Sequence, residues 1–314
     1  MDTLFPNAGP YLGRGGRMAW ESNDGEPGGA EDLERRERML RSYVRSLGSV
    51  AMVFMGGVGS RVLARTCHDV LGDRMIAVSP CGGTIAAEAQ ESARTWCGSQ
   101  GIELLLPDFD NLQVPGLADN RRNRCDLCRH ALFSELQIIA RARGLGYVAE
   151  PSDADEVAAR PTLLRAATDL NVKSPLMHVG LGAREVRELA LRMGEDPEPP
   201  SQPICLAAQV EQGVGITPDR LARVEFARAL VASLGLAGLR VDLVRGDGEV
   251  ALVRAARTGA GTAAAARLHA DGGLRHELVS GLLGLGFGRV WLELGEGPAG
   301  DAQGDGDKAE VPQA

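Results

Sequence analysis

The sequence predicts an α/β protein in which a parallel sheet carries helices on both faces and a smaller α+β domain follows. Up to about residue 200, short apolar runs alternate with stretches of helical hydrophobic spacing. A glycine turn, Gly56-Gly57, directly follows the first apolar run. Beyond the proline-rich segment 196–200, the pattern changes to a helix followed by two closely spaced strands. Regular alternation is typical of parallel sheets, and the later pattern is typical of a separate α+β unit.

The first domain is predicted over residues 31–200. Apolar residues at helical spacing predict a first helix over 31–47, with later helices over 85–100, 127–143 and 184–193. Strands are predicted at 49–55, 75–78, 102–106 and 146–149, and a further short strand at 173–177. Because each strand is followed by a helix, consecutive strands are expected to run parallel.

The second domain is predicted over residues 201–294. Thr217 and Pro218 suit the N-cap and first position of a helix that ends at Gly235. Strands at 239–244 and 249–254 are joined by a glycine-containing hairpin turn, and a helix at 274–285 and a strand at 289–294 complete an α-β-β-α-β unit. The arm 1–30 and the tail 295–314 have no hydrophobic period and are predicted to be disordered.

Charge and hydropathy exclude several classes of protein. The net charge of −8 argues against a protein that gains its affinity by neutralising the phosphates of nucleic acid. No run of 18 apolar residues occurs, and the N-terminus lacks the apolar stretch of a signal peptide. We therefore expect a cytoplasmic protein that neither spans a membrane nor binds nucleic acid.

The glycine turn is a candidate anion site. Backbone N–H groups of such a turn, backed by a helix N-terminus, bind phosphate, although a strand-to-helix turn also needs glycine for its geometry alone. The loop resembles the PP-loop of ATP pyrophosphatases, Ser-Gly-Gly-x-Asp-Ser, and matches it at Gly56, Gly57 and Ser60. The leading Ser is Met55 and the Asp is Gly59. The resemblance implies a Rossmann-like nucleotide-binding domain with Gly56, Gly57 and Ser60 at the ATP phosphates.

Two of the six cysteines, Cys125 and Cys128, stand one helical turn apart at the start of a predicted helix. Thiols in that position favour metal or cluster binding. Cys205, at the junction of the predicted domains, is a third candidate ligand. Cys67 and Cys97 lie on apolar stretches and are predicted to be buried small hydrophobes.

From Ser49 to Leu294 the chain resembles the LarE family, the sulfur transferases that make the nickel-pincer cofactor of lactate racemase. The matching segments are 70–78, 123–133, 160–167, 172–176, 185–190, 205–206, 216–225 and 233–235. The resemblance implies a reaction in which ATP and Mg²⁺ adenylate a pyridinium dicarboxylate mononucleotide, a small-molecule nucleotide substrate, and sulfur is then transferred to it. It also implies a homo-oligomer.

The resemblance assigns roles to particular residues. Family members with three cysteines at these places carry a [4Fe-4S] cluster, which implies Cys125, Cys128 and Cys205 as ligands, with Cys205 also the catalytic cysteine. Three thiolates leave one iron open for an extra sulfide. Arg160, Arg165, Arg223 and Arg240 are the candidates for contact with the substrate phosphate.

Several positions depart from the family pattern. Its Asp-Gly-Thr-Asn is Ala149-Glu150-Pro151-Ser152 here, and its Ser-Ser-Arg after the third cysteine ends in Gln209. Its Glu-x-Ala-Glu ends in Arg228, and the second Arg of its Arg-x-Arg is Asp242. Three interpretations stay open: a sulfur transferase, a catalytically impaired paralogue that serves as a binding or regulatory protein, and an adenylating enzyme for a different acid.

Overall fold

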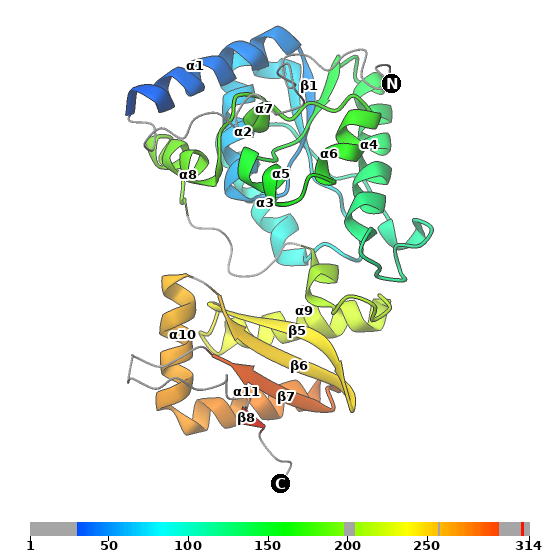
Figure 1. Ribbon diagram of the computed structural model, residues 1–314, viewed down its shortest axis with the longest axis vertical. Coiled ribbons are helices and arrows are strands. Elements are labelled where there is room, and N and C mark those ends of the chain that lie inside the picture. Colours follow the sequence, from blue (N-terminus) through cyan, green and yellow to red (C-terminus); the bar gives the residue numbers. More distant parts are fainter. Residues whose placement is uncertain (1–29, 198–204, 257, 295–308, 311–314) are drawn as a thin grey trace. The chain divides into compact units, whose positions relative to one another are not determined.

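The computed structural model describes residues 30–197, 205–256, 258–294 and 309–310 (Figure 1). The predicted disordered arm and tail therefore lie outside the described residues, except for Ala30 and the pair 309–310. The chain forms two compact units. The first comprises residues up to 78 together with 98–104 and 135–197, and the second comprises 79–97, 105–134 and the chain from 198 onward. Segments 79–97 and 105–134 lie within the range that the sequence predicted for the first domain.

A four-stranded sheet of order β3-β2-β1-β4 belongs to the α/β part of the chain. Its strands are β1 (Val50–Val53), β2 (Met75–Val78), β3 (Leu104–Leu105) and β4 (Tyr147–Ala149). β1 pairs in parallel with β2 on one side and with β4 on the other, so that Val50 stands opposite both Met75 and Tyr147. All four residues of β1 are buried, as expected for the central strand of a parallel sheet covered on both faces.

Helices precede, connect and follow these strands along the chain. They are α1 (Ala30–Leu47), α2 (Val58–Leu71), α3 (Ala87–Gln100), α4 (Arg124–Ala142), α5 (Ala154–Ala159), α6 (Leu163–Asp169), α7 (Pro175–His178) and α8 (Ala183–Arg192), with short 3₁₀ turns η1 (Gly72–Arg74) and η2 (Asn111–Gln113). α1 packs on α2, and α2 packs on α8. Cys67 on α2 and Cys97 on α3 are fully buried, which confirms their predicted place in the core.

The strand predicted at 173–177 is wrong. Only Lys173 pairs, in an isolated parallel bridge with Ala149. Residues Pro175–His178 instead form the helical turn α7, with Pro175 at its start. Proline is favoured at the first helical position because its fixed φ suits the helix and no N–H is lost there.

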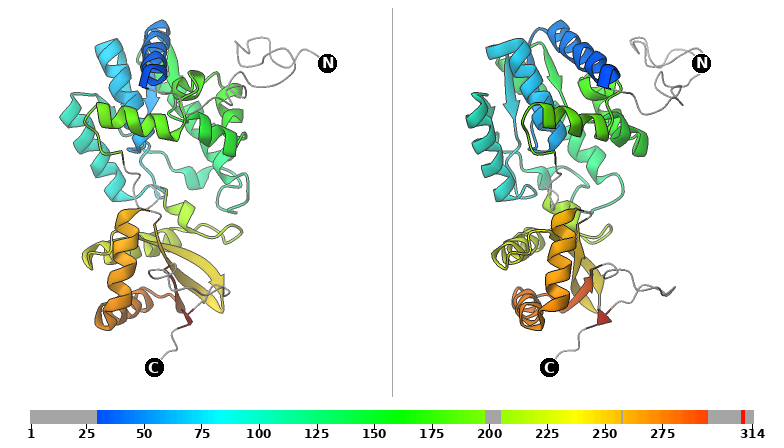
Figure 2. Two further views of the ribbon diagram at one scale, coloured as in Figure 1. Left: turned by 60° about the vertical axis from the view of Figure 1, so that its left-hand side comes forward. Right: turned by 90° about the vertical axis from the view of Figure 1, so that its left-hand side faces the viewer.

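The second sheet has the order β5-β6-β7-β8 (Figures 1 and 2). Its elements are η3 (Leu206–Gln209), α9 (Pro218–Ser233), β5 (Leu239–Gly246), β6 (Gly248–Ala255), α10 (Gly259–Ala270), α11 (Gly272–Gly284), β7 (Arg289–Glu293) and β8 (Ala309–Glu310). β5 and β6 form the expected hairpin, and β7 runs parallel to β6. Thr217 caps α9 by accepting a hydrogen bond from the Arg220 N–H, as predicted.

Two features of this unit differ from the sequence prediction. α10 was not predicted, so two helices separate β6 from β7 and the order is α-β-β-α-α-β. The run Gly259–Ala270 consists mostly of Ala and Gly, which give little hydrophobic periodicity. In the predicted tail, Ala309 and Glu310 pair antiparallel with Leu292 and Trp291 of β7.

The core of the second sheet lies on one face of the β5–β6 hairpin. Val241 and Leu243 of β5 and Val253 of β6 are completely buried in it. Because successive side chains of a strand point to opposite faces, Arg240 and Asp242 lie on the other face. Among the described helices, none combines the length and hydropathy needed to cross a membrane.

Candidate functional site

The three candidate ligand cysteines come together within the second unit. Cys125 and Cys128 lie in the first turn of α4, and Cys205 immediately precedes η3. Cys205 forms an isolated antiparallel bridge with Ile85, which ties its segment to the start of α3. The thiols lie near enough for the charges of Cys205 and Cys125 to affect the ionisation of Cys128.

The three thiols differ in exposure. Cys125 is exposed, whereas Cys128 and Cys205 are partly covered. Burial, and then the neighbouring Cys205 thiolate, raises the pKa of the Cys128 thiol to about 11. Burial also raises the pKa of Cys205, opposed by hydrogen bonds from the backbone and by the positive charge of Arg124. Burial thus disfavours the thiolate form of both covered cysteines.

A buried amide stands beside the cysteines. Asn111 in η2 is only 3% exposed, and its Nδ2 lies 3.9 Å from Cys128 Sγ. The same Nδ2 donates to Thr84 Oγ1, and the Thr84 carbonyl accepts from the Leu206 N–H at 2.7 Å. Asn111 therefore links the segment that follows Cys205 to the helix that carries Cys128.

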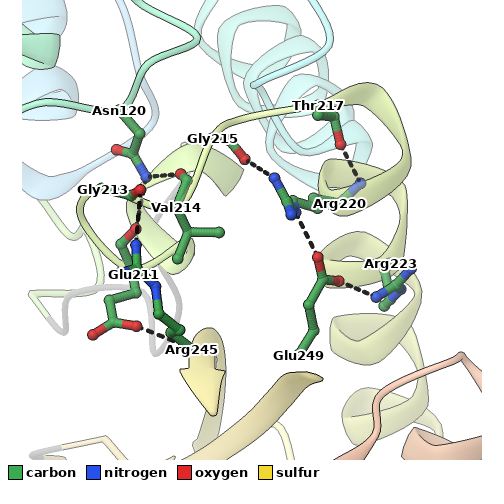
Figure 3. A network of polar contacts seen from close by, with 10 residues as sticks. All are labelled: Asn120, Glu211, Gly213, Val214, Gly215, Thr217, Arg220, Arg223, Arg245 and Glu249. Carbon is green, nitrogen blue, oxygen red and sulfur yellow. Dashed lines mark hydrogen bonds and ion pairs between the residues drawn. The ribbon is translucent and has the colours of Figure 1, made fainter. Parts of the chain in front are cut away.

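A clasp formed by Asn120 and Arg124 positions the start of α4. Asn120 is completely buried with a positive φ of 54°, and its amide donates to the carbonyls of Val210, Glu211 and Val214 at 3.3, 2.9 and 2.8 Å. Figure 3 shows this amide facing the loop between η3 and α9. Arg124 adds a hydrogen bond to the Ala207 carbonyl at 2.8 Å. These bonds hold the helix bearing Cys125 against the segment that follows Cys205.

Next to Cys125 lies a cavity of about 410 Å³, also within the second unit. Its lining includes five arginines, namely Arg121, Arg122, Arg124, Arg240 and Arg254. Among the described residues that line it, the carboxylates are Glu211 and Asp242, so these residues carry a net charge of +3 in a chain whose net charge is −8. We call this the arginine cavity. A pocket of this size and sign suits a small anionic ligand.

Asp242 organises one wall of the arginine cavity. Arg240 and Arg254 stand directly opposite each other on β5 and β6, an unfavourable pairing of like charges. Asp242 is 5% exposed and accepts from Arg240 Nε at 2.6 Å and from Arg254 Nη1 at 3.3 Å. Burial raises the pKa of Asp242, although both arginines act in the opposite direction. The carboxylate therefore separates two guanidinium groups that would otherwise repel.

The cysteines are not arranged as a site for one ion. Among the residues described, no group of three or more His, Cys, Asp or Glu side chains could hold a single metal ion. A cubane cluster spreads its thiolate ligands more widely, because each thiolate binds a different iron. Cys125, Cys128 and Cys205 are therefore candidate ligands for a cluster, with the Asn111 amide nitrogen 3.9 Å from the Cys128 sulfur.

The glycine loop lies in the first unit, after β1, which is the strand at which the strand order of the sheet reverses. β2 and β4 flank β1 on opposite sides, and ligands of parallel sheets bind beside the carboxyl ends of strands at such a point. Gly56 has a positive φ of 74°, and Gly57 forms the N-cap of α2. The Ser60 hydroxyl is buried and accepts a hydrogen bond from the Met55 N–H at 3.2 Å.

Gly59 packs closely on the loop that follows β4. A Cβ atom at Gly59 would lie 3.1 Å from the Pro151 carbonyl oxygen and 3.5 Å from Leu176 Cδ1. The space that an Asp side chain would need here is thus partly filled. The loss of Asp from this loop and the presence of Pro151 belong to one local arrangement.

The predicted phosphate ligands fall in different places. Arg240 lines the arginine cavity beside Cys125. Arg223, of the same unit, is not among its lining residues and forms an ion pair with Glu249, as Figure 3 shows. Arg160 and Arg165 are exposed residues of the first unit, and Arg160 lies 4.0 Å from Glu156.

Sequence reasoning missed five residues of this region. Arg121, Arg122, Arg124 and Arg254 line the arginine cavity, and Asn111 lies beside Cys128. The alternation of β6 places Arg254 on the same face of the hairpin as Arg240, a signal that was available in the sequence. Arg121, Arg122 and Asn111 lie outside regular strands and long helices, so no periodicity marks them.

The described architecture is that of a mixed α/β protein with a four-stranded parallel sheet, compatible with a Rossmann-like fold. No protein-family model matches the sequence. The chain is similar to the uncharacterized protein slr1717 of Synechocystis sp., with 29% identity over 210 residues, which are 67% of this chain and 78% of that protein. It is also similar to the pyridinium-3,5-bisthiocarboxylic acid mononucleotide synthase of Lactiplantibacillus plantarum, with 24% identity over 67% of this chain and 76% of that protein. The second relative is a distant homologue of the LarE type, which supports the predicted resemblance.

Proposed function

We propose that this protein is an ATP-dependent sulfur transferase of the LarE type. The observation that carries the proposal is the meeting of Cys125, Cys128 and Cys205 beside the arginine cavity. A set of soft sulfur ligands next to a site for an anion is what transfer of sulfur to an anionic substrate requires. The similarity to a synthase of a bisthiocarboxylic acid mononucleotide supports the same activity.

The proposed substrate is a pyridinium dicarboxylate mononucleotide. ATP, held with Mg²⁺ by the PP-loop residues Gly56, Gly57 and Ser60, would transfer AMP to a substrate carboxylate and release pyrophosphate. A sulfur nucleophile then forms a C–S bond to the activated carbonyl carbon, and the C–O bond to AMP breaks. Adenylation makes this possible because AMP is a far better leaving group than oxide.

The cysteines supply the sulfur chemistry in this proposal. Cys125, Cys128 and Cys205 would hold a [4Fe-4S] cluster, and that cluster would supply the sulfur for transfer. Arg240 would contact the substrate phosphate, with Arg160, Arg165 and Arg223 as further candidates. Charge-assisted hydrogen bonds from arginine to phosphate contribute about 1.5–3 kcal/mol each.

A second function is favoured by the glycine loop. The Ser60 hydroxyl accepts from the Met55 N–H, and the Pro151 carbonyl lies close to Gly59. The loop thus lacks the PP-loop carboxylate and has little room for it, and a protein that held no nucleotide here would be a catalytically impaired paralogue that acts by binding. Such a protein would keep the cysteine site and the arginine cavity, since neither includes a residue of the loop.

Pyrophosphate release separates the two functions. The protein would be purified without oxygen, reconstituted with iron and sulfide, and assayed with Mg-ATP and the pyridinium dicarboxylate mononucleotide. Release that depends on the mononucleotide is the result expected for the transferase. Cys205→Ala controls for the sulfur step, because it removes a cysteine but no loop residue and should leave adenylation intact.

A repaired loop makes a negative result informative. The variant Met55→Ser/Gly59→Asp restores the two PP-loop residues that this chain lacks. Activity in the repaired variant alone would establish the impaired paralogue. If neither protein releases pyrophosphate, although circular dichroism shows that both are folded, the proposed adenylation is contradicted.

A further inference from the structure

We propose that Arg121 and Arg122 form an anion-recognition lip that binds the phosphate of a small ligand in the arginine cavity. The inference rests on the proposed function for the ligand's chemical class, a pyridinium mononucleotide that bears a carboxylate as well as a phosphate. It names residues for which the family resemblance gives no role. Both arginines lie in the short segment between Asn120 and α4.

The charges of the cavity are unequally compensated. Arg240 and Arg254 share the buried carboxylate of Asp242, and Arg254 also pairs with Glu293 at 3.0 Å. Arg121 has only an exposed ion pair with Asp119 at 3.3 Å, a type of contact that contributes little. Arg122 makes no hydrogen bond or ion pair with any other described residue. Arg124 hydrogen-bonds to Asn120 and to the Ala207 carbonyl, which carry no charge. The positive charge available to a ligand therefore lies at Arg121, Arg122 and Arg124, of which the two lip arginines are exposed.

The lip is held in place although its arginines are exposed. Asn120, the residue before Arg121, is anchored by its three donated hydrogen bonds, and the Arg124 N–H donates to the Arg121 carbonyl at 2.9 Å. The backbone of the segment is thus fixed at both ends, while two long side chains can reach an anion. Pre-organised backbone of this kind lowers the entropy lost on binding.

Cys125 lines the same cavity as the lip, so a ligand whose phosphate binds at the lip can place its carboxylate near this cysteine. Its thiol is exposed and belongs to the cavity lining, together with both arginines. A cavity of about 410 Å³ lies in the range of sites for single small molecules. A mononucleotide whose phosphate binds at the lip would have its pyridinium ring within the cavity that Cys125 lines.

The test is a binding measurement that needs no ATP, iron, sulfide or turnover. Nicotinic acid mononucleotide, its riboside and inorganic phosphate would be titrated into the protein by calorimetry at low ionic strength. We expect the mononucleotide to bind at least about ten-fold more tightly than the riboside, because one lost charged contact corresponds to that factor. We also expect Arg121→Gln/Arg122→Gln to weaken mononucleotide binding by about ten-fold or more.

The matched control is Arg38→Gln/Arg184→Gln. These arginines are exposed, pair with neighbouring glutamates and belong to the first unit, so the variant changes net charge equally. It should bind like the natural protein. Equal affinity for mononucleotide and riboside, equal affinity of the lip variant and the control, or no binding to the natural protein would each overturn the inference.

A second readout uses the natural protein alone, so it does not depend on the folding of a variant. Bound mononucleotide should slow alkylation of Cys125 by iodoacetamide, measured by peptide mass mapping, and leave alkylation of the unfolded protein unchanged. Unprotected Cys125 at saturating mononucleotide would contradict the proposed location. Binding without sulfur transfer would leave this inference standing while the proposed enzymatic function failed, so the two failures are distinguishable.

Discussion

Arg228 Nη1 donates a hydrogen bond to Gln209 Oε1 at 3.0 Å, and both side chains are buried. Gln209 Nε2 in turn donates to the Val241 carbonyl at 2.7 Å. Where the LarE pattern has Arg and Glu, this chain has Gln209 and Arg228, and the structure places the two in contact. We expect the two departures to be one exchange of partners within this buried contact.

This contact predicts the effect of restoring the family residues. Gln209→Arg alone should lower the free energy of unfolding by about 2–4 kcal/mol, because it buries two guanidinium groups side by side. Gln209→Arg/Arg228→Glu should recover most of that loss by forming an ion pair. Urea unfolding followed by circular dichroism measures both. A double variant no more stable than Gln209→Arg would refute the exchange.

Replacing Gly59 by the Asp of the PP-loop pattern should destabilise the protein. Gly59→Asp should lower the free energy of unfolding by about 1–3 kcal/mol, because its Cβ would lie 3.1 Å from the Pro151 carbonyl oxygen. Gly57→Asp is the control with the same charge. Gly57 has no atom within 4 Å of its Cβ position and forms the N-cap of α2, where Asp is favoured. Thermal unfolding should show a lower melting temperature for Gly59→Asp than for Gly57→Asp. Equal stability would show that the Pro151 carbonyl leaves room for an Asp side chain at position 59.

The Asn120 clasp should stabilise the fold only while the side chain at position 120 can donate hydrogen bonds to the backbone carbonyls. Asn120→Asp keeps the shape of the side chain but places a carboxylate against three carbonyl oxygens. We expect a loss of about 2–4 kcal/mol in the free energy of unfolding. Asn123→Asp, at an exposed position of the same segment, should change it by less than about 0.5 kcal/mol. Similar values for the two variants, from chemical denaturation, would argue against the clasp.

Alkaline pH should destabilise the protein through Cys67. Complete burial raises the pKa of this thiol from its ordinary value of 9.0 to about 12. Between those values the unfolded chain loses the proton and the folded chain keeps it. Stability is therefore unaffected by this thiol below pH 9 and falls above it, by at most about 1.4 kcal/mol per pH unit.

The variant Cys67→Ala isolates that effect. Cys97, whose burial raises its pKa to about 11, acts in the same direction and remains in both proteins. The free energy of unfolding of the natural protein, measured from pH 8 to pH 10.5, should fall more steeply than that of Cys67→Ala. Parallel curves would mean that Cys67 is accessible to solvent in the folded protein.

Much of the fold was predictable because its strongest signals are periodic. The apolar run at Val50–Val53, the glycine turn after it and the Thr217 cap all mark elements through local chemistry. α10 was missed because an Ala and Gly run lacks a hydrophobic face. The turn at Pro175–His178 was predicted as a strand because four residues are too few to show a period.

The site was predictable in its chemistry and less so in its surroundings. The spacing of Cys125 and Cys128 and the match at Cys205 predicted a shared site, and the structure places these thiols near one another, while their role as ligands stays a prediction. Arg121 and Arg122 could not be selected from many surface arginines, because only the fold of the Asn120 segment places them at the cavity. The contact between Gln209 and Arg228 joins positions 19 residues apart, which no local pattern reveals.

The most direct test of sulfur transfer is mass spectrometry of the product. The reconstituted protein would be incubated with Mg-ATP, the pyridinium dicarboxylate mononucleotide and isotopically labelled sulfide. Labelled thiocarboxylate should form with the natural protein and disappear with Cys125→Ala, Cys128→Ala and Cys205→Ala, while Cys97→Ala, away from the site, retains activity. Absence of labelled product from a folded protein that binds both iron and mononucleotide would contradict the proposed function.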